Sequence, residues 1–321
     1  MKKYRLLITY PLPLEYKIPD YIEVIQKEWK NAPTLDVLQE SVKDIDAIIS
    51  MLSIKWNKKT LKYANKLKII ANFAVGYDNI DLKYCKDNNI IVTNTPDVLS
   101  VATAEIAFTL LLSTLRRTNE AATYLKDGKF KGWLPDLFLG NSLEGKTVGI
   151  IGAGRIGQKF AQYLLGFNTK TYYYNRNRLD TNIEKKLNMT YLELDRLIEL
   201  SDIISIHTPL NSSTKNLVDS NFLKKAKDGL YIINTARGDI IDEDALIDNI
   251  DKLGGVGLDV FVGEPTLNMK LIHDKIVVLP HIGSADKKTR EKMSKICYNN
   301  VLAVLNKRKP LTEVTFRGEI C

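Results

Sequence analysis

The sequence predicts an α/β protein with two Rossmann-like or flavodoxin-like domains, each built on a parallel sheet. Two series of short, β-branched apolar runs alternate with segments of helical spacing, one on either side of a long apolar stretch. A glycine-rich turn, Gly152-Ala-Gly-Arg-Ile-Gly157, opens the second series. The 321 residues are enough for about two domains. Because open α/β sheets bind ligands beyond the carboxyl ends of their strands, we expect the active site in the cleft between the domains.

The first series begins with a strand expected over residues 5–10 and a helical segment around residues 21–29. Short apolar runs predict further strands at residues 47–52, 68–71 and 90–92. Segments with helical spacing predict helices between them at residues 58–64 and 82–88. Loops 53–55 and 74–78 follow two of these strands. They are therefore expected at the sheet edge where ligands bind.

One long helix is expected over residues 98–118, and its lack of a polar face predicts that it is buried. A looser segment at residues 126–135 indicates a connection on the surface. It carries Trp133, which fits either a local packing anchor or an interface residue. A second long helix, over residues 287–306, is expected to return to the first domain.

The second series is long enough for a complete dinucleotide-binding domain. Its strands are expected from residue 147 and at residues 169–174, 203–206, 230–234, 256–258 and 276–279, with a short strand or turn near residues 189–191. Helices are expected at residues 158–165, 193–200, 221–227 and 242–250. We therefore assign residues 100–286 to an NAD(P)-binding Rossmann domain. Residues 1–99 together with 287–321 are assigned to the other domain.

The composition excludes several classes of protein. The net charge is +8, but Lys and Arg are dispersed among Asp and Glu, which argues against nucleic-acid binding and favours a solvated surface that can steer anions. No apolar run approaches the roughly 20 residues that span a bilayer, and the first residues lack the pattern of a signal peptide. We therefore expect a cytoplasmic protein without membrane attachment. Cys85, Cys297 and Cys321 are widely spaced and indicate reduced thiols, with neither a disulfide framework nor a metal site.

The glycine turn has the context of a dinucleotide-binding site, because a buried strand enters it and a helical pattern leaves it. Gly152 would allow the tight turn, Gly154 would let the backbone approach a pyrophosphate, and Gly157 would let the helix pack on the strand. The alternative is a glycine-rich turn in an unrelated α/β protein. The flanking strand and helix favour dinucleotide binding over that alternative.

The end of the next strand bears on which cofactor is bound. NAD-binding domains carry Asp or Glu there for the ribose 2′-hydroxyl, whereas this chain has Asn175-Arg-Asn-Arg178. Arg176 can pair with a 2′-phosphate, and Asn175 brings no repelling charge. NADP(H) is therefore favoured over NAD(H). The alternative is that the arginines are simply solvated at the strand end, which would fit use of both cofactors.

Three more motifs each follow an expected strand of the second domain: Asn234-Thr-Ala-Arg-Gly238, Asp259 with Glu264-Pro265, and Pro280-His-Ile-Gly283. The carboxyl ends of these strands share one sheet edge, so Arg237, Glu264 and His281 can meet beside the glycine turn. Taken alone, each has a simpler interpretation, namely a surface salt bridge, a loop carboxylate and a structural histidine. Together with the dinucleotide turn they indicate a redox site.

These motifs resemble the D-isomer-specific 2-hydroxyacid dehydrogenase family, and the resemblance covers nearly the whole chain. Val75-Gly-Tyr-Asp-Asn-Ile80 and Val92-Thr-Asn-Thr-Pro-Asp97 resemble in particular its glyoxylate/hydroxypyruvate reductase branch, as does Asn175-Arg176. The resemblance implies NAD(P)H-dependent reduction of a small 2-oxo acid to the D-2-hydroxy acid. It also implies that residues 1–99 and 287–321 form the substrate-binding (catalytic) domain. It also implies a homodimer, for which the helix at residues 98–118 would suit the interface.

The resemblance further implies a role for each motif residue. His281 would be the general acid for the carbonyl oxygen, Glu264 would hold its imidazole and favour the protonated form, and Arg237 would bind the substrate carboxylate. The substrate side would consist of Ser53, the backbone N–H groups of Val75 and Gly76, and Arg237. The cofactor side would consist of Thr103, Gly152, Gly154, Arg155, Ile156, Gly157, Asn175, Arg176, His207, Thr208, Pro209, Thr235, Ala236, Arg237, Asp259, His281 and Gly283.

Two details of these assignments separate the histidines and the acidic residues by role. Asp259 would be the partner of the nicotinamide carboxamide. His207 belongs to the adenosine-side loop and is not assigned as a second acid, while His273 lies in no motif and is expected to be solvated.

Other functions stay open at this level. Within the family they are phosphoglycerate dehydrogenase, D-lactate-type dehydrogenase and 2-ketogluconate reductase. A different class is a non-catalytic NAD(H)-sensing module, as in corepressors built on this fold. Such a module would not need Arg237, Glu264 and His281, and this chain keeps all three.

Overall fold

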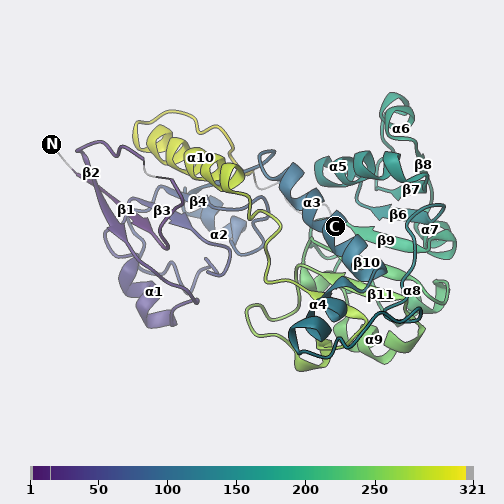
Figure 1. Cartoon of the computed structure of the whole chain (residues 1–321). Coiled ribbons are helices and arrows are strands. Elements are labelled where there is room, and N and C mark those ends of the chain that lie inside the picture. Colours follow the sequence, from purple (N-terminus) through teal and green to yellow (C-terminus); the bar gives the residue numbers. More distant parts are fainter. Residues whose placement is uncertain (1–2, 15, 316–321) are drawn as a thin grey trace. The chain divides into compact units, whose positions relative to one another are not determined.

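A computed structural model describes residues 3–14 and 16–315, so that Cys321 lies outside the described residues. The chain divides into two compact units, unit 1 (Met1–Leu99 and Ala285–Cys321) and unit 2 (Ser100–Ser284) (Figure 1). Each unit holds one sheet, and the strand pairs of both sheets are parallel. The expected α/β fold with two parallel sheets is confirmed.

Unit 1 is built on a five-stranded sheet in the order β2-β1-β3-β4-β5. Its strands are β1 (Tyr4–Ile8), β2 (Ile22–Gln26), β3 (Ala47–Ser50), β4 (Ile69–Asn72) and β5 (Ile91–Thr93). Its helices are α1 (Leu35–Ser41), which was not predicted, α2 (Leu82–Asp87) and α10 (Lys287–Leu305).

Helices cover both faces of this sheet, which explains why the central strands β3 and β4 are buried along their whole length. Ile48 and Ile70 pack in one core with residues of α1 and α2. Ile49 and Ala71, one position further along, pack in a second core with Val301 of α10. The alternation follows from the period of two in a strand.

Two helices expected in unit 1 are absent from the described residues. The segment around residues 21–29 contains the edge strand β2, because its β-branched residues pair in register with β1, from Tyr4↔Ile22 to Ile8↔Gln26. Residues 58–64 form turns. There the side chain of Asn57 accepts hydrogen bonds from the N–H groups of Lys59 and Thr60, which competes with a helix.

Unit 2 is built on a seven-stranded sheet in the order β12-β11-β10-β9-β6-β7-β8. Its strands are β6 (Thr147–Ile151), β7 (Lys170–Tyr174), β8 (Met189–Tyr191), β9 (Ile203–Ile206), β10 (Tyr231–Asn234), β11 (Gly255–Leu258) and β12 (Ile276–Val278). Its α-helices are α3 (Ser100–Leu115), α4 (Thr118–Lys126), α5 (Arg155–Leu164), α6 (Thr181–Leu187), α7 (Leu194–Leu200), α8 (Ser220–Lys225) and α9 (Glu243–Asp248).

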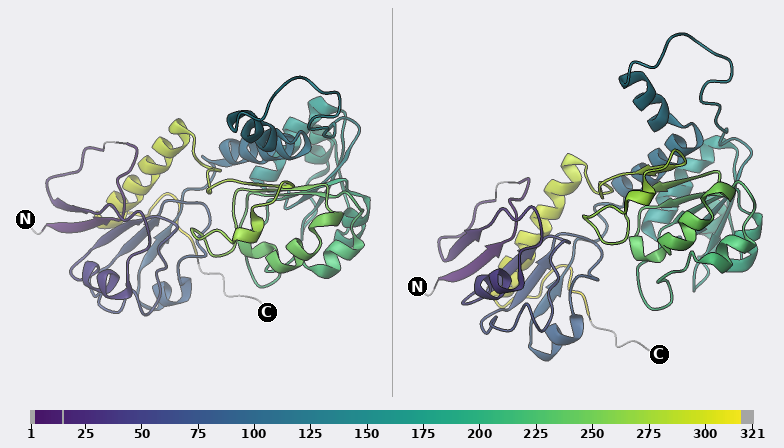
Figure 2. Two further views of the ribbon diagram at one scale, coloured as in Figure 1. Left: turned by 60° about the horizontal axis from the view of Figure 1, so that its bottom comes forward. Right: turned by 90° about the horizontal axis from the view of Figure 1, so that it is seen from below.

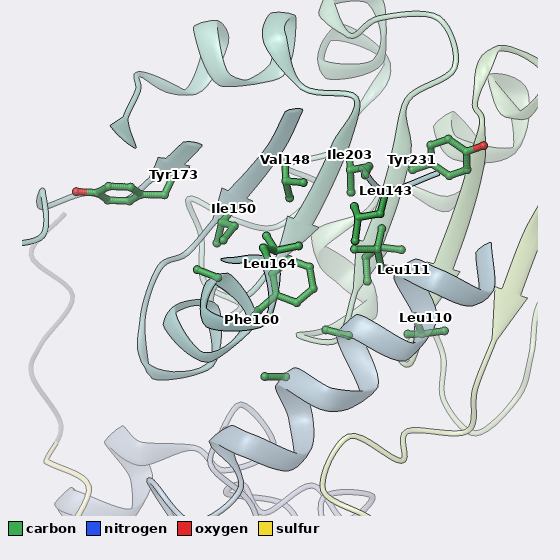
Figure 3. Packing of buried hydrophobic residues seen from close by; sticks show 14 of the residues in the cluster. Leu110, Leu111, Leu143, Val148, Ile150, Phe160, Leu164, Tyr173, Ile203 and Tyr231 are labelled. Carbon is green, nitrogen blue, oxygen red and sulfur yellow. The ribbon is translucent and has the colours of Figure 1, made fainter. Parts of the chain in front are cut away.

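The long helix expected over residues 98–118 is α3, which ends at Leu115, and a second helix that was not predicted, α4, begins at Thr118. They are separated at Arg117, whose φ of 53° is left-handed and cannot continue a helix. Leu110 and Leu111 of α3 are buried in a core with Phe160 of α5 (Figure 3). None of the residues of α4 is buried. Among the described residues, no helix has both the length and the apolar character needed to cross a bilayer.

Candidate active site

The glycine turn joins β6 to α5, and its three glycines differ in what the protein itself requires. Gly152 has φ of +95°, and a Cβ there would lie 2.7 Å from the carbonyl carbon of His207. A Cβ on Gly157 would lie 2.4 Å from the carbonyl oxygen of Gly152. A Cβ on Gly154 would meet no atom of the described residues within 4 Å. The open space beside Gly154, at the start of α5, therefore fits the close approach of a ligand phosphate.

The residues after β7 hold the turn and form an ion pair. The side-chain oxygen of Asn175 accepts a hydrogen bond from the N–H of Ala153 at 2.8 Å. Arg178 donates two hydrogen bonds to Glu184, at 2.8 and 2.9 Å, so that it fixes the loop after the strand. Arg176 is exposed at the strand end. Of the two arginines, Arg176 is therefore the better placed to contact a 2′-phosphate.

Glu184 is also bonded to Tyr173, whose hydroxyl donates to the same carboxylate at 2.6 Å. The hydrogen bonds from Arg178 and then from Tyr173 lower the pKa of Glu184 to about 2. Burial and the bond to Glu184 raise the pKa of Tyr173 to about 12. The network is therefore an ionised carboxylate held by a cation and a neutral phenol.

The loop His207-Thr208-Pro209 follows β9, which pairs directly with β6. The N–H of His207 donates to the carbonyl of Ile151 at 2.8 Å, which places the loop against the glycine turn. Burial lowers the pKa of His207 to about 3, so that its imidazole is neutral near pH 7. This is consistent with a cofactor-side residue and not with a proton donor.

His281 and Glu264 are in direct contact. The Nδ1 atom of His281 lies 2.7 Å from a carboxylate oxygen of Glu264, and each side chain is 30% exposed. The other carboxylate oxygen of Glu264 accepts from the N–H of Phe261 at 3.2 Å. The pair leaves Nε2 as the ring nitrogen that can exchange a proton with a substrate.

Asp259 holds the loop that carries His281. Its side chain is buried, and its two oxygens accept from the N–H groups of Ile282 and Gly283 at 2.7 Å each. Its carbonyl accepts from the N–H of His281 at 2.9 Å. Burial raises the pKa of Asp259, while the two backbone donors oppose the rise. Each carboxylate oxygen of Asp259 can accept one more hydrogen bond, which leaves room for a donor such as the nicotinamide carboxamide. That contact remains a prediction.

The loop of Arg237 packs against the loop of Glu264. Asn234, at the end of β10, accepts from the N–H of Ala236 at 2.9 Å and donates to the carbonyl of Arg237 at 2.8 Å. A Cβ on the next residue, Gly238, would lie 2.2 Å from the carbonyl carbon of Phe261. Only glycine allows this approach, so the two loops are neighbours at one sheet edge.

The remaining predicted residues of unit 2 line the same edge. Thr103 lies in α3, where its Cγ2 would be 3.3 Å from a Cβ added to Gly283. Thr235 is buried, and its hydroxyl has no partner among the described residues. Arg155 and Ile156 are the first residues of α5.

The predicted substrate side is divided between the units. Val75 and Gly76 lie half-buried in a loop of unit 1, where Ser53 is exposed in a neighbouring loop. Arg237 belongs to unit 2. Asn72, which ends β4 and is fully buried, was not predicted as a site residue from the sequence. An asparagine at the end of an apolar strand was the available signal, because a buried amide must find hydrogen-bonding partners.

A dinucleotide turn and an imidazole–carboxylate pair at one edge of a parallel sheet define the class of nicotinamide-dependent oxidoreductases. Comparison with known proteins specifies the family. Residues 108–283 match the model of the D-isomer specific 2-hydroxyacid dehydrogenase, NAD binding domain. A glyoxylate reductase from Thermococcus litoralis is 44% identical over 284 residues, 86% of each chain. One from Thermococcus onnurineus is 38% identical over 97% of this chain and 96% of its own.

A solved structure agrees with these relatives. The NADPH-dependent glyoxylate/hydroxypyruvate reductase from Sinorhizobium meliloti, in complex with NADP and malonate, has a TM-score of 0.86 and 31% identity over 98% of this chain and 97% of its own. The chain belongs to the D-isomer-specific 2-hydroxyacid dehydrogenase family, in its glyoxylate reductase branch. It is an oxidoreductase acting on CH–OH donors, and the resemblance seen in its motifs is confirmed.

Proposed function

We propose that this chain reduces a small 2-oxo acid, glyoxylate or hydroxypyruvate, to the D-2-hydroxy acid. The observation that carries the proposal is the 2.7 Å contact between His281 and Glu264, at the sheet edge that also bears the dinucleotide turn. The relatives named glyoxylate reductase support the choice of substrate.

In the proposed mechanism each side chain has one task. Arg237 binds the carboxylate and polarises the carbonyl, and the N–H groups of Val75 and Gly76 bind the same carboxylate from unit 1. His281 gives a proton to the carbonyl oxygen as the oxygen gains negative charge, and Glu264 stabilises the imidazolium before that transfer. The bound nicotinamide supplies the hydride for the carbonyl carbon. In the oxidative direction His281 takes the proton back.

We further propose a preference for NADP(H) over NAD(H). Arg176 is the exposed cation after β7, and the position of the usual acidic residue is occupied by Asn175, which is bonded to the glycine turn. The relative from Sinorhizobium meliloti is described as NADPH-dependent and contains NADP. A non-catalytic sensing module is disfavoured, because it has no need for the pairing of Glu264 with His281.

We also propose that the protein is a homodimer formed through α4 and the segment that follows it. The exposed fractions of apolar side chains are high there, with Leu125 at 63%, Trp133 at 81%, Leu134 at 55% and Leu139 at 66%. A hollow of about 600 Å³, lined by residues of α3, α4 and the stretch 267–278, lies beside them. A cytoplasmic location stays a prediction from the sequence.

The test of the proposed reaction is a panel of initial rates. Glyoxylate, hydroxypyruvate, pyruvate and 2-ketogluconate are each supplied with NADPH and with NADH. We expect the highest kcat/KM with glyoxylate or hydroxypyruvate. His281→Gln should lower kcat by about 100-fold or more and leave the dissociation constant of NADPH unchanged. Near-normal turnover by this variant would remove His281 from the acid role.

A further inference from the structure

In the loop of unit 1 that holds Val75 and Gly76, the four successive carbonyl groups from Ala74 to Tyr77 all accept a hydrogen bond. The carbonyl of Ala74 accepts from the N–H of Thr95 at 2.8 Å, and that of Tyr77 accepts from the N–H of Ile80 at 2.9 Å. The two carbonyls between them are held by side chains. Asn94 Nδ2 donates to the carbonyl of Val75, and Asn72 Nδ2 donates to that of Gly76, each at 2.8 Å.

Three successive N–H groups of the same loop, those of Val75, Gly76 and Tyr77, have no partner among the described residues, although Val75 and Gly76 are half-buried. In a trans peptide the C=O and the N–H point in opposite directions. A side chain that holds the carbonyl of Val75 therefore sets the direction of the N–H of Gly76, and one that holds the carbonyl of Gly76 sets that of Tyr77.

A second asparagine fixes Asn72. Asn72 Nδ2 donates to Oδ1 of Asn79 at 3.1 Å, and Asn79 Nδ2 donates back to Oδ1 of Asn72 at 3.2 Å. Asn79 also donates to the carbonyl of Ile54 at 3.1 Å, next to Ser53. Both side chains are buried, with exposed fractions of 0% and 7%. The amide pair therefore ties the two predicted substrate loops of unit 1 to each other.

We propose that Asn94 and Asn72 are positioning residues for the substrate carboxylate. By holding two successive carbonyls they turn the N–H groups of Gly76 and Tyr77 away from the protein interior, so that these groups and the N–H of Val75 bind the carboxylate. The inference rests on the proposed function for the identity of the acid. The N–H of Tyr77 is thereby a third donor to the carboxylate, and the direction of the N–H groups of Gly76 and Tyr77 is set by two side chains that do not touch the substrate. Successive backbone N–H groups of this kind form anion-binding concavities.

The experiment compares Asn94→Ala and Asn72→Leu with the wild-type enzyme. Leu has nearly the shape of Asn but cannot donate, and Asn94 is only half-buried, so its variant tests the inference if the buried variant does not fold. We expect each substitution to raise the KM for glyoxylate by about tenfold, because the donors are misdirected. The KM for NADPH should change by less than about twofold, since unit 2 is unaltered.

The matched control is Asp46→Asn. Asp46 is buried in unit 1 and pairs with Lys68. It precedes β3, so it lies at the amino ends of the parallel strands, whereas loop 74–78 follows the carboxyl end of β4. The Asp46→Asn substitution should lower the melting temperature without changing the KM for glyoxylate. An unchanged KM for glyoxylate in a folded Asn94→Ala or Asn72→Leu variant would overturn the inference. An equal rise in the KM for NADPH would do the same.

Titration with oxalate distinguishes this inference from the proposed function. Oxalate presents a carboxylate next to a second carbonyl group, as a 2-oxo acid does, and its binding is measured by calorimetry without turnover. We expect Asn94→Ala to weaken oxalate binding by about tenfold. If the wild-type enzyme binds oxalate but reduces none of the acids, the proposed function fails while the positioning is still tested. If it reduces glyoxylate but oxalate binding is the same in wild type and variant, the positioning fails alone.

Discussion

The imidazole of His281 and the carboxylate of Glu264 lie 2.7 Å apart, although 17 positions separate them in the chain. Their meeting could be anticipated from the sequence, because both residues follow strands whose carboxyl ends share a sheet edge. The contacts that hold the two residues in place could not be anticipated. The clamp from Asp259 to the N–H groups of Ile282 and Gly283 depends on loop geometry, which no periodicity in the sequence encodes.

Arg176→Ala tests cofactor preference at a single residue. Loss of a charge-assisted hydrogen bond to the 2′-phosphate should raise the KM for NADPH by about tenfold or more, while the KM for NADH changes by less than about twofold. Arg196→Ala removes another exposed arginine of unit 2, one that pairs with Glu199, and should leave both constants unchanged. Equal effects of Arg176→Ala on the two cofactors would show that Arg176 does not recognise the phosphate.

The elements were predicted best where the apolar pattern is regular or unbroken and worst where a short segment depends on its neighbours. Helix α10 and strands β9 and β12 lie within a residue of their expected bounds. Residues 21–29 were expected to be helical, yet they contain β2, which is a strand because β1 offers an edge to pair with. The break between α3 and α4 depends on the left-handed backbone of Arg117. An arginine gives no sequence signal for this conformation, which is uncommon outside Gly, Asn and Asp.

The glycine turn gives a prediction in which stability and binding separate. Gly157→Ala should lower the free energy of unfolding by about 1–3 kcal/mol, because the new Cβ overlaps the carbonyl of Gly152. Gly154→Ala has open space and should leave the melting temperature within about 2 °C, yet weaken NADPH by about tenfold, since the methyl group occupies the path of the pyrophosphate. Thermal unfolding and fluorescence titration measure the two effects. Normal NADPH affinity in Gly154→Ala would show that the pyrophosphate does not bind beside Gly154.

The loop between β7 and α6 gives a prediction about pH. The folded-state pKa of Glu184 is about 2, below its ordinary value of 4.5, so its ion pair with Arg178 stabilises the fold above pH 4.5 and loses this effect as the pH falls towards 2. Glu184→Gln lacks this titration. The urea midpoint of the wild-type protein should therefore exceed that of the variant at pH 7, and the difference should shrink below pH 4.5. A difference that is constant with pH would contradict the assignment of the lowered pKa to Glu184.

At the scale of the whole molecule, the two parallel sheets and the family could be predicted from the sequence, since they depend on motifs that follow strands. The exposed helix α4 could not be predicted, because the sequence pattern ended the long helix at residue 118 and indicated no second helix after it. Figure 2 shows α4 and the loop after it standing away from the sheet of unit 2, in dark teal. None of the residues of α4 is buried, and the side chain of Leu125 is 63% exposed.

The proposed homodimer predicts a change in mass on substitution. We expect the wild-type protein to sediment with twice the mass of one chain. Replacing both Leu125 and Leu134 with Asp should shift it towards the monomer, because charges would be buried at the interface. Leu165→Asp, at another exposed leucine of unit 2, is the control and should stay dimeric. A double variant that keeps the dimer mass would place the interface elsewhere.

The way the chain passes through its two units has a consequence for biosynthesis. Unit 2 is one continuous stretch, Ser100–Ser284, so it can complete its folding while the ribosome is still extending the polypeptide. Unit 1 cannot, because α10, which shields Ile49 and Ala71, is translated after all of unit 2. Until α10 is synthesised, the apolar face of the first sheet that α10 covers is exposed to solvent. We therefore expect chaperones to bind the nascent chain mainly during this interval.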